Sequence, residues 1–118
     1  MNTETRDLVV EKTHGIDHEL SSVGLVIALG RMTSGLKVSI FLTSAGVDLV
    51  RRGASDMTHV KPLEPLADML REGGTLWACT PCVKSRGYTQ ENLLEGVVIA
   101  RASVIHELIK RGAATLSF

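Results

Sequence analysis

Three times along this chain, a segment with a helical pattern ends in glycine and leads at once into a short apolar run. The three places are Gly35 before residues 37–42, Gly73-Gly74 before residues 75–79, and Gly112 before residues 114–118. Glycine ends helices because it has no Cβ and adopts the left-handed conformation without a clash. A repeated step from helix to strand is typical of αβ units, whose strands form a parallel sheet.

The repeat predicts a flavodoxin-like α/β three-layer sandwich, with about five mainly parallel strands and helices on both faces. The strands are expected at residues 7–11, 37–43, 75–78 and 114–118, and residues 96–99 are expected to form a short buried strand or an extended turn. The helices are expected at residues 17–34, 47–52 and 101–111, with one that begins at Pro62 and a short one capped by Thr89. Sites in such sheets form at the carboxyl ends of strands, which selects the segments after residues 11, 42, 78 and 99.

Apolar positions indicate which faces of two helices are buried. In the last helix, the residues expected to face inward are Ala102, Ile105, Leu108 and Ile109. The helix at residues 17–34 carries Leu20, Val23 and Ile27 on one stripe and further apolar side chains, such as Val26, elsewhere. A helix that is apolar on more than one face is either deeply buried or packed against another subunit.

Length and charge narrow the class of protein. With 118 residues, the chain is expected to form a single domain over residues 1–118. Thirteen basic and thirteen acidic residues leave no excess positive charge to bind phosphates, so no nucleic-acid partner is expected. A net charge of zero also means little electrostatic repulsion between copies of the chain, which favours self-association. No apolar run reaches the roughly 20 residues that span a bilayer, and no signal peptide is recognised. We therefore expect a soluble cytoplasmic protein with no membrane partner.

Cys79 and Cys82 are the only cysteines, and in a reducing cytosol they are expected to be reactive rather than permanently bridged. Cys79 stands where a strand ends and a helical turn begins. Amide N–H groups and the helix dipole there favour the thiolate, which is the nucleophile, and Lys84 and Arg86 add positive potential. Cys79 is therefore the expected catalytic residue, with Cys82 one turn away as a thiol that could resolve an oxidised or persulfidated Cys79.

Plainer interpretations of the cysteines remain open. Cys82 is alternatively a small buried hydrophobic residue, or both cysteines are structural. A zinc site needs about four ligands, and only His14 and His18 are spaced as a near pair, so no metal and no other cofactor is expected.

Further candidate site residues follow the first two strands. His14 and His18 could exchange a proton at the same sheet edge as the cysteines, or could be ordinary loop histidines. The amides of Thr43, Ser44 and Gly46 could hold an anion such as a sulfur oxyanion, or could form an ordinary turn.

The segment 77–88, WACTPCVKSRGY, resembles the cysteine segment of DsrE-like proteins, a family that includes the DsrE, TusD and YchN types. Its members carry a cysteine at a strand end and an Arg-Gly dipeptide at the spacing of Arg86-Gly87. The two-cysteine form is similar to the YchN branch. Residues 41–47 and 113–118 are similar to the family's second strand with its glycine turn and to its closing strand, so the resemblance extends over residues 8–118.

The resemblance implies a flavodoxin-like fold assembled into homotrimers or homohexamers. It implies that Cys79 takes up sulfane sulfur as a persulfide and passes it on, with sulfur donor and acceptor proteins as partners. Thr80 and Arg86 of the matched segment are expected to contact the substrate. Cys82 has no counterpart in the DsrE and TusD pattern. A thiol–disulfide redox protein that uses Cys79 and Cys82, and a non-catalytic oligomeric binding module, are the alternative functions.

Overall fold

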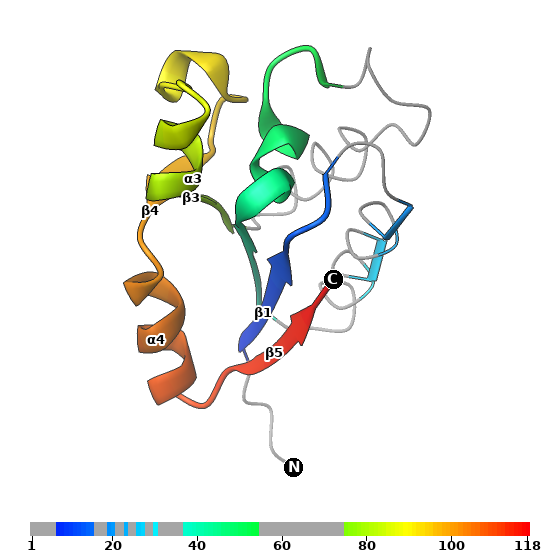
Figure 1. Ribbon diagram of the computed structural model, residues 1–118. Coiled ribbons are helices and arrows are strands. Elements are labelled where there is room, and N and C mark those ends of the chain that lie inside the picture. Colours follow the sequence, from blue (N-terminus) through cyan, green and yellow to red (C-terminus); the bar gives the residue numbers. More distant parts are fainter. Residues whose placement is uncertain are drawn as a thin grey trace.

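The computed structural model describes residues 7–15, 19–20, 23, 26–27, 30, 37–54 and 75–118. Within these residues, five strands form one sheet (Figure 1). They are β1 (Asp7–Lys12), β2 (Lys37–Leu42), β3 (Thr75–Cys79), β4 (Val98–Ala100) and β5 (Ala114–Ser117). The strand order is β4-β3-β2-β1-β5, and every neighbouring pair is parallel. The flavodoxin-like α/β fold expected from the sequence is confirmed.

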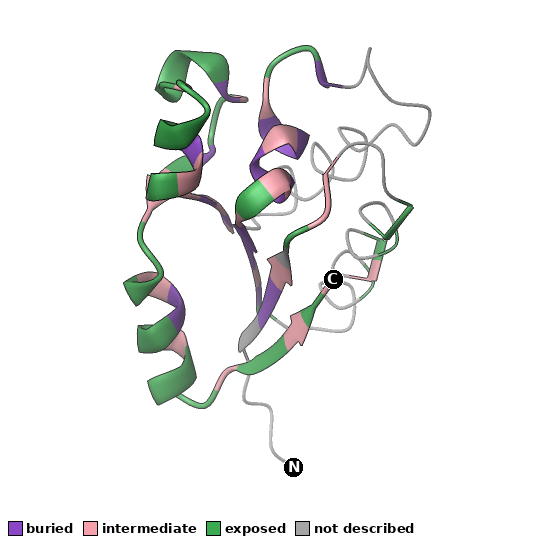
Figure 2. Ribbon diagram, viewed as in Figure 1, coloured by how far each residue is buried: buried purple, intermediate pink, exposed green. Residues whose placement is uncertain are grey.

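The sheet is covered on both faces because successive side chains of a strand point to opposite sides. Val10 and Ile40 are fully buried in a core cluster on one face. Val9 and Phe41, their neighbours in sequence, are buried on the other face, where they pack with Ile105. Figure 2 shows buried segments, in purple, along the middle strands of the sheet and exposed segments, in green, on the outer sides of the helices.

Four short helices have both of their ends within the described residues. They are η1 (Ser44–Val50), α3 (Thr80–Ser85), η3 (Gln90–Asn92) and α4 (Ser103–Lys110). η1 and α3 contact each other, and both contribute to the cluster around Val10 and Ile40. α4 supplies Ile105 to the opposite face and joins β4 at one edge of the sheet to β5 at the other. The sheet is therefore the middle of three layers.

The buried face of α4 differs from the expected one. Ile105 is buried and Leu108 is half-buried, as predicted, but Ala102 is exposed and Ile109 is 47% exposed. Val104 packs against the core instead. The helix begins at Ser103 and covers the sheet with one narrow stripe, so apolar residues beside that stripe remain in solvent.

Of the helix expected at residues 17–34, the structure describes only a few positions, all of them helical except Glu19, which lies in a turn. Its Val23 and Val26 are 45% and 59% exposed, and Leu20 is 37% exposed, whereas Ile27 is half-buried. The helix expected to begin at Pro62 lies outside the described residues. Across the part of the chain that the structure describes, no helix combines the length and the apolar character needed to cross a membrane.

Candidate functional site

The carboxyl ends of three neighbouring strands lie level with one another. Lys12 of β1 pairs in register with Leu42 of β2, which pairs with Ala78 of β3. The residues that follow these positions therefore meet at one edge of the sheet. Gly15 lies so close to the start of η1 that an added Cβ would stand 3.0 Å from the carbonyl oxygen of Ala45.

Cys79 is the last residue of β3 and the N-cap residue of α3. β3 thus extends one residue beyond its predicted end, and the helical turn begins directly after the cysteine, as expected. Cys79 and Cys82 are both free thiols and both half-buried. Cys79 packs against the clusters on both sheet faces, whereas Cys82 packs against the one that includes Val10. Neither sulfur is sealed inside the core.

Cys82 lies close enough to Cys79 for both its side chain and its backbone N–H to act on the Cys79 thiol. Burial raises the pKa of the Cys79 thiol above its ordinary value, and the hydrogen bond to the Cys82 side chain raises it further. The backbone N–H acts in the opposite direction but is outweighed. The sequence-based expectation of a thiolate at Cys79 was therefore wrong in direction. A six-residue helix offers little dipole, and the adjacent sulfur opposes a second negative charge.

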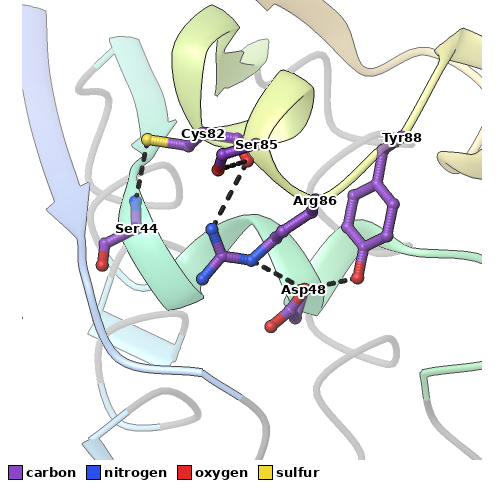
Figure 3. Close-up of polar contacts among 6 residues, drawn as sticks. All are labelled: Ser44, Asp48, Cys82, Ser85, Arg86 and Tyr88. Carbon is purple, nitrogen blue, oxygen red and sulfur yellow. Dashed lines mark hydrogen bonds and ion pairs between the residues drawn. The ribbon is translucent and has the colours of Figure 1, made fainter.

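Cys82 receives a hydrogen bond from a different element. The backbone N–H of Ser44, the first residue of η1, donates to Cys82 Sγ at 3.1 Å (Figure 3). Ser44 has a φ of 51°, in the left-handed region that residues other than glycine seldom occupy. Gly46, by contrast, donates its N–H to the carbonyl oxygen of Thr43 at 2.8 Å and so closes a turn. Of these three predicted residues, Ser44 is the one whose amide contacts a sulfur.

Asp48 ties η1 to the segment after α3. Its Oδ1 accepts a hydrogen bond of 2.6 Å from the Tyr88 hydroxyl and lies 3.4 Å from Nε of Arg86 (Figure 3). Nη1 of Arg86 also donates to the carbonyl oxygen of Cys82 at 3.4 Å. Burial, followed by the hydrogen bond to Asp48, raises the pKa of Tyr88. Arg86 therefore holds the cysteine helix in place with a side chain that the sequence suggested for substrate binding.

Asp48 and Tyr88 were not identified as site residues from the sequence. Tyr88 lies within the matched segment 77–88, so its position two residues after Arg86 was a usable signal. The sequence around Asp48 gave no such signal, because a single carboxylate in a short helical segment is normally solvated.

The remaining predicted site residues are Thr80, His14 and His18. Thr80 is the first residue of α3, next to Cys79, and is half-buried. His14 is half-buried beside Gly15, at the same sheet edge as Ser44. His18 lies outside the described residues. Among the described residues, no group of three or more His, Cys, Asp or Glu side chains is arranged to hold a metal ion.

A parallel five-stranded sheet, with one thiol on the last residue of β3 and a second in the helix that follows, defines a flavodoxin-like α/β protein with a cysteine site at the carboxyl edge. The chain belongs to the DsrE/DsrF-like family, whose model matches residues 8–118. The resemblance seen in the cysteine segment is thereby confirmed.

Two archaeal proteins are similar in sequence. The uncharacterized protein MK0008 of Methanopyrus kandleri is 34% identical over 91 residues, which cover 77% of this chain and 73% of that protein. The uncharacterized protein MJ0989 of Methanocaldococcus jannaschii is 30% identical over 102 residues, which cover 86% of this chain and 85% of that protein.

Two solved structures share the fold. The ychN protein from E. coli superimposes with a TM-score of 0.82 at 21% identity, over 98% of this chain and 100% of that one. MTH1491 from Methanobacterium thermoautotrophicum, a protein of unknown function, superimposes with a TM-score of 0.70 at 20% identity, over 98% of this chain and 100% of that one. At these identities the likeness shows the fold alone.

Proposed function

We propose that this protein is a sulfur carrier with sulfurtransferase-like chemistry, which binds sulfane sulfur as a persulfide on Cys79 and passes it to an acceptor. One observation carries the proposal: Cys79 is half-buried at the carboxyl end of β3, with a second cysteine three residues later in the first turn of α3. Membership of the DsrE/DsrF-like family supports the same class of function.

The uptake step is a thiol exchange and needs no organic cofactor. Cys79 attacks the outer sulfur of a persulfide donor, a bond forms between the two sulfurs, and the donor leaves as its thiol with the Cys79 proton. Because the pKa of Cys79 is raised and the thiolate is the reactive form, the uptake step begins with loss of the Cys79 proton. The cytoplasm, where thiols stay reduced, suits this chemistry and is the location we propose.

Intact-mass measurement tests the carrier role. After incubation with a persulfidated donor and removal of excess donor, Cys82→Ser is expected to gain the mass of one sulfur atom, and Cys79→Ser is not. Reduction with a small dithiol should remove the added mass. If Cys82→Ser gains no sulfur from persulfide, polysulfide or thiosulfate, the carrier role is excluded.

The positions of the two cysteines, at the N-cap and the third residue of α3, also favour a second candidate, a thiol–disulfide redox protein. Mild oxidation without any sulfane sulfur should then remove both free thiols within one chain. A protein that keeps two titratable thiols under these conditions does not have this function.

We further propose that copies of the chain associate into a homotrimer or homohexamer. Exposed apolar side chains on the N-terminal helix, at Val23 and Val26, support this proposal, because burying them against another copy removes apolar surface from water. Sedimentation velocity measures the subunit number directly. A monomer at micromolar concentration contradicts the proposal.

A further inference from the structure

Cys82 has the contacts of a thiol that takes part in the reaction. We propose that Cys82 discharges the Cys79 persulfide, so that the protein releases hydrogen sulfide and forms an internal Cys79–Cys82 disulfide. This activity is that of a persulfide reductase, and its substrate class is a low-molecular-weight persulfide. The inference rests on the proposed function, because it begins with sulfur bound to Cys79.

The two cysteines are placed for a direct bond. Cys79 is the N-cap residue of α3 and Cys82 is the third residue of that helix. Residues three apart in a helical turn have Cβ atoms about 5–6 Å apart, and a modest adjustment brings them within the range of a disulfide. The Cys82 side chain is near enough to act on the Cys79 thiol, and both residues are only half-buried, so neither is closed off from a small persulfide donor.

A hydrogen bond from the backbone N–H of Ser44 distinguishes Cys82 from a cysteine that takes no part in the reaction. The Ser44 N–H lies 3.1 Å from Cys82 Sγ and comes from the loop after β2 rather than from α3 itself. A donor in this place stabilises negative charge on Cys82 as its proton leaves and the sulfur attacks. The left-handed φ of Ser44 aims the donor, and such strained backbone is concentrated at functional sites.

Residue 82 is held at its backbone as well as at its sulfur. Its carbonyl oxygen accepts hydrogen bonds from Ser85 Oγ at 3.0 Å and from Arg86 Nη1 at 3.4 Å. Arg86 is anchored in turn by Asp48, which also binds Tyr88 (Figure 3). Because Asp48 belongs to the same short helix as Ser44, this network sets the distance between the Ser44 amide and Cys82. Asp48 is a positioning residue in this account.

The discharge step balances without an external oxidant. The Cys82 sulfur attacks the inner sulfur of the persulfide, Cys79 Sγ, and the bond from Cys79 Sγ to the outer sulfur breaks. The outer sulfur leaves with its hydrogen and takes up the Cys82 proton as hydrogen sulfide. Two electrons pass from the two cysteines to the sulfane sulfur, and a dithiol reductant later restores both thiols.

Internal attack competes with transfer to an acceptor protein. A group held within one helical turn reacts at a high effective concentration, whereas an acceptor must first dock. Sulfur therefore reaches an acceptor only when docking precedes the attack by Cys82. Without an acceptor, the chain is expected to turn over small persulfides to sulfide as long as a dithiol reductant is present.

A single-turnover experiment tests the inference. The reduced wild-type protein, Cys82→Ser and Cys79→Ser are mixed with glutathione persulfide without oxygen and desalted at once. Sulfide release, free thiols and intact mass are then followed. The wild type is expected to release as much sulfide as there is protein and to lose both thiols. Cys82→Ser is expected to keep the added sulfur and release none.

The outcomes separate the two proposals. A wild type that keeps both the added sulfur and a free Cys82 overturns the discharge by Cys82, while the sulfur retained on Cys82→Ser still supports the carrier. A Cys82→Ser protein that gains no sulfur overturns the carrier and the inference together.

Asp48→Asn tests the positioning role of Asp48. The substitution is expected to slow sulfide release roughly tenfold, while the amount of sulfur bound by the double variant Asp48→Asn/Cys82→Ser stays the same as in Cys82→Ser. If Asp48→Asn releases sulfide at the wild-type rate, Asp48 does not position Cys82.

Discussion

The backbone N–H of Ser44 donates to the sulfur of Cys82 at 3.1 Å and so joins the loop after β2 to the helix after β3. This contact links two segments that are 38 residues apart in the chain. It is possible because β2 and β3 are parallel neighbours whose carboxyl ends lie level. The site is therefore a product of the sheet register as much as of the cysteine motif.

Removal of the Cys82 side chain is expected to lower the pKa of Cys79. Two of the causes that raise it, the side-chain hydrogen bond and the charge of Cys82, disappear in Cys82→Ala, whereas the backbone N–H that lowers it remains. Alkylation of Cys79 by iodoacetamide, followed by peptide mass spectrometry over a range of pH, gives the pKa in the wild type and the variant. An unchanged or higher pKa in Cys82→Ala contradicts this effect of Cys82 on the Cys79 thiol.

Tyr88→Phe is expected to destabilise the fold by about 1.5 kcal/mol, because it removes a hydrogen bond to a carboxylate while leaving the ring. The folded pKa of Tyr88 is raised, so the hydrogen bond contributes fully below the ordinary pKa of tyrosine and is lost as pH rises through the folded value. Urea denaturation at neutral and alkaline pH measures both effects. The gap between wild type and Tyr88→Phe should narrow at alkaline pH, and a constant gap contradicts this account.

Gly15→Ala is expected to destabilise the protein by about 1–3 kcal/mol. The new Cβ would lie 3.0 Å from the backbone oxygen of Ala45 and 3.1 Å from its Cβ, so the loop after β1 and the start of η1 must move apart. Gly30→Ala is the matched control, because a Cβ there meets nothing within 4 Å on a helix. That variant should be neutral or more stable by up to about 1 kcal/mol. Equal midpoints of thermal unfolding for both variants would refute the close packing.

Val26→Glu is expected to shift the protein toward smaller assemblies. Val26 is 59% exposed, so a charge there costs little in a single chain but much in an apolar contact between copies. Sedimentation velocity and circular dichroism separate assembly from folding. Ile109→Glu, at a 47% exposed position on α4, is the matched control and should leave the assembly size unchanged. A Val26→Glu protein with the sedimentation coefficient of the wild type would exclude this helix from the interface.

Much of the fold could be predicted from short-range patterns. β2 occupies residues 37–42, one residue short of its predicted end, and Gly112, with a φ of 89°, ends α4 as a helix-terminating glycine. Thr89 precedes η3 and its N–H donates to Asn92 Oδ1 at 2.8 Å, in agreement with its predicted capping role. Such features depend on residues a few positions apart. The exposure of Ile109 was missed because periodicity shows which residues share a helix face, not how wide a stripe its neighbours cover.

The amino-acid sequence by itself determined the strands to within two residues at their ends, their parallel arrangement and the position of Cys79 at a strand end, since local propensity, glycine and alternation decide these. The largest difference is at β4, which was expected at residues 96–99 and spans Val98–Ala100. Only the tertiary structure decided the surroundings of the two sulfurs. The raised pKa of Cys79 follows from burial and from the nearby Cys82 side chain, and Asp48 reaches Tyr88 across 40 residues of chain. Burial and long-range hydrogen bonds depend on which segments the sheet brings together, and no pattern within a single segment specifies them.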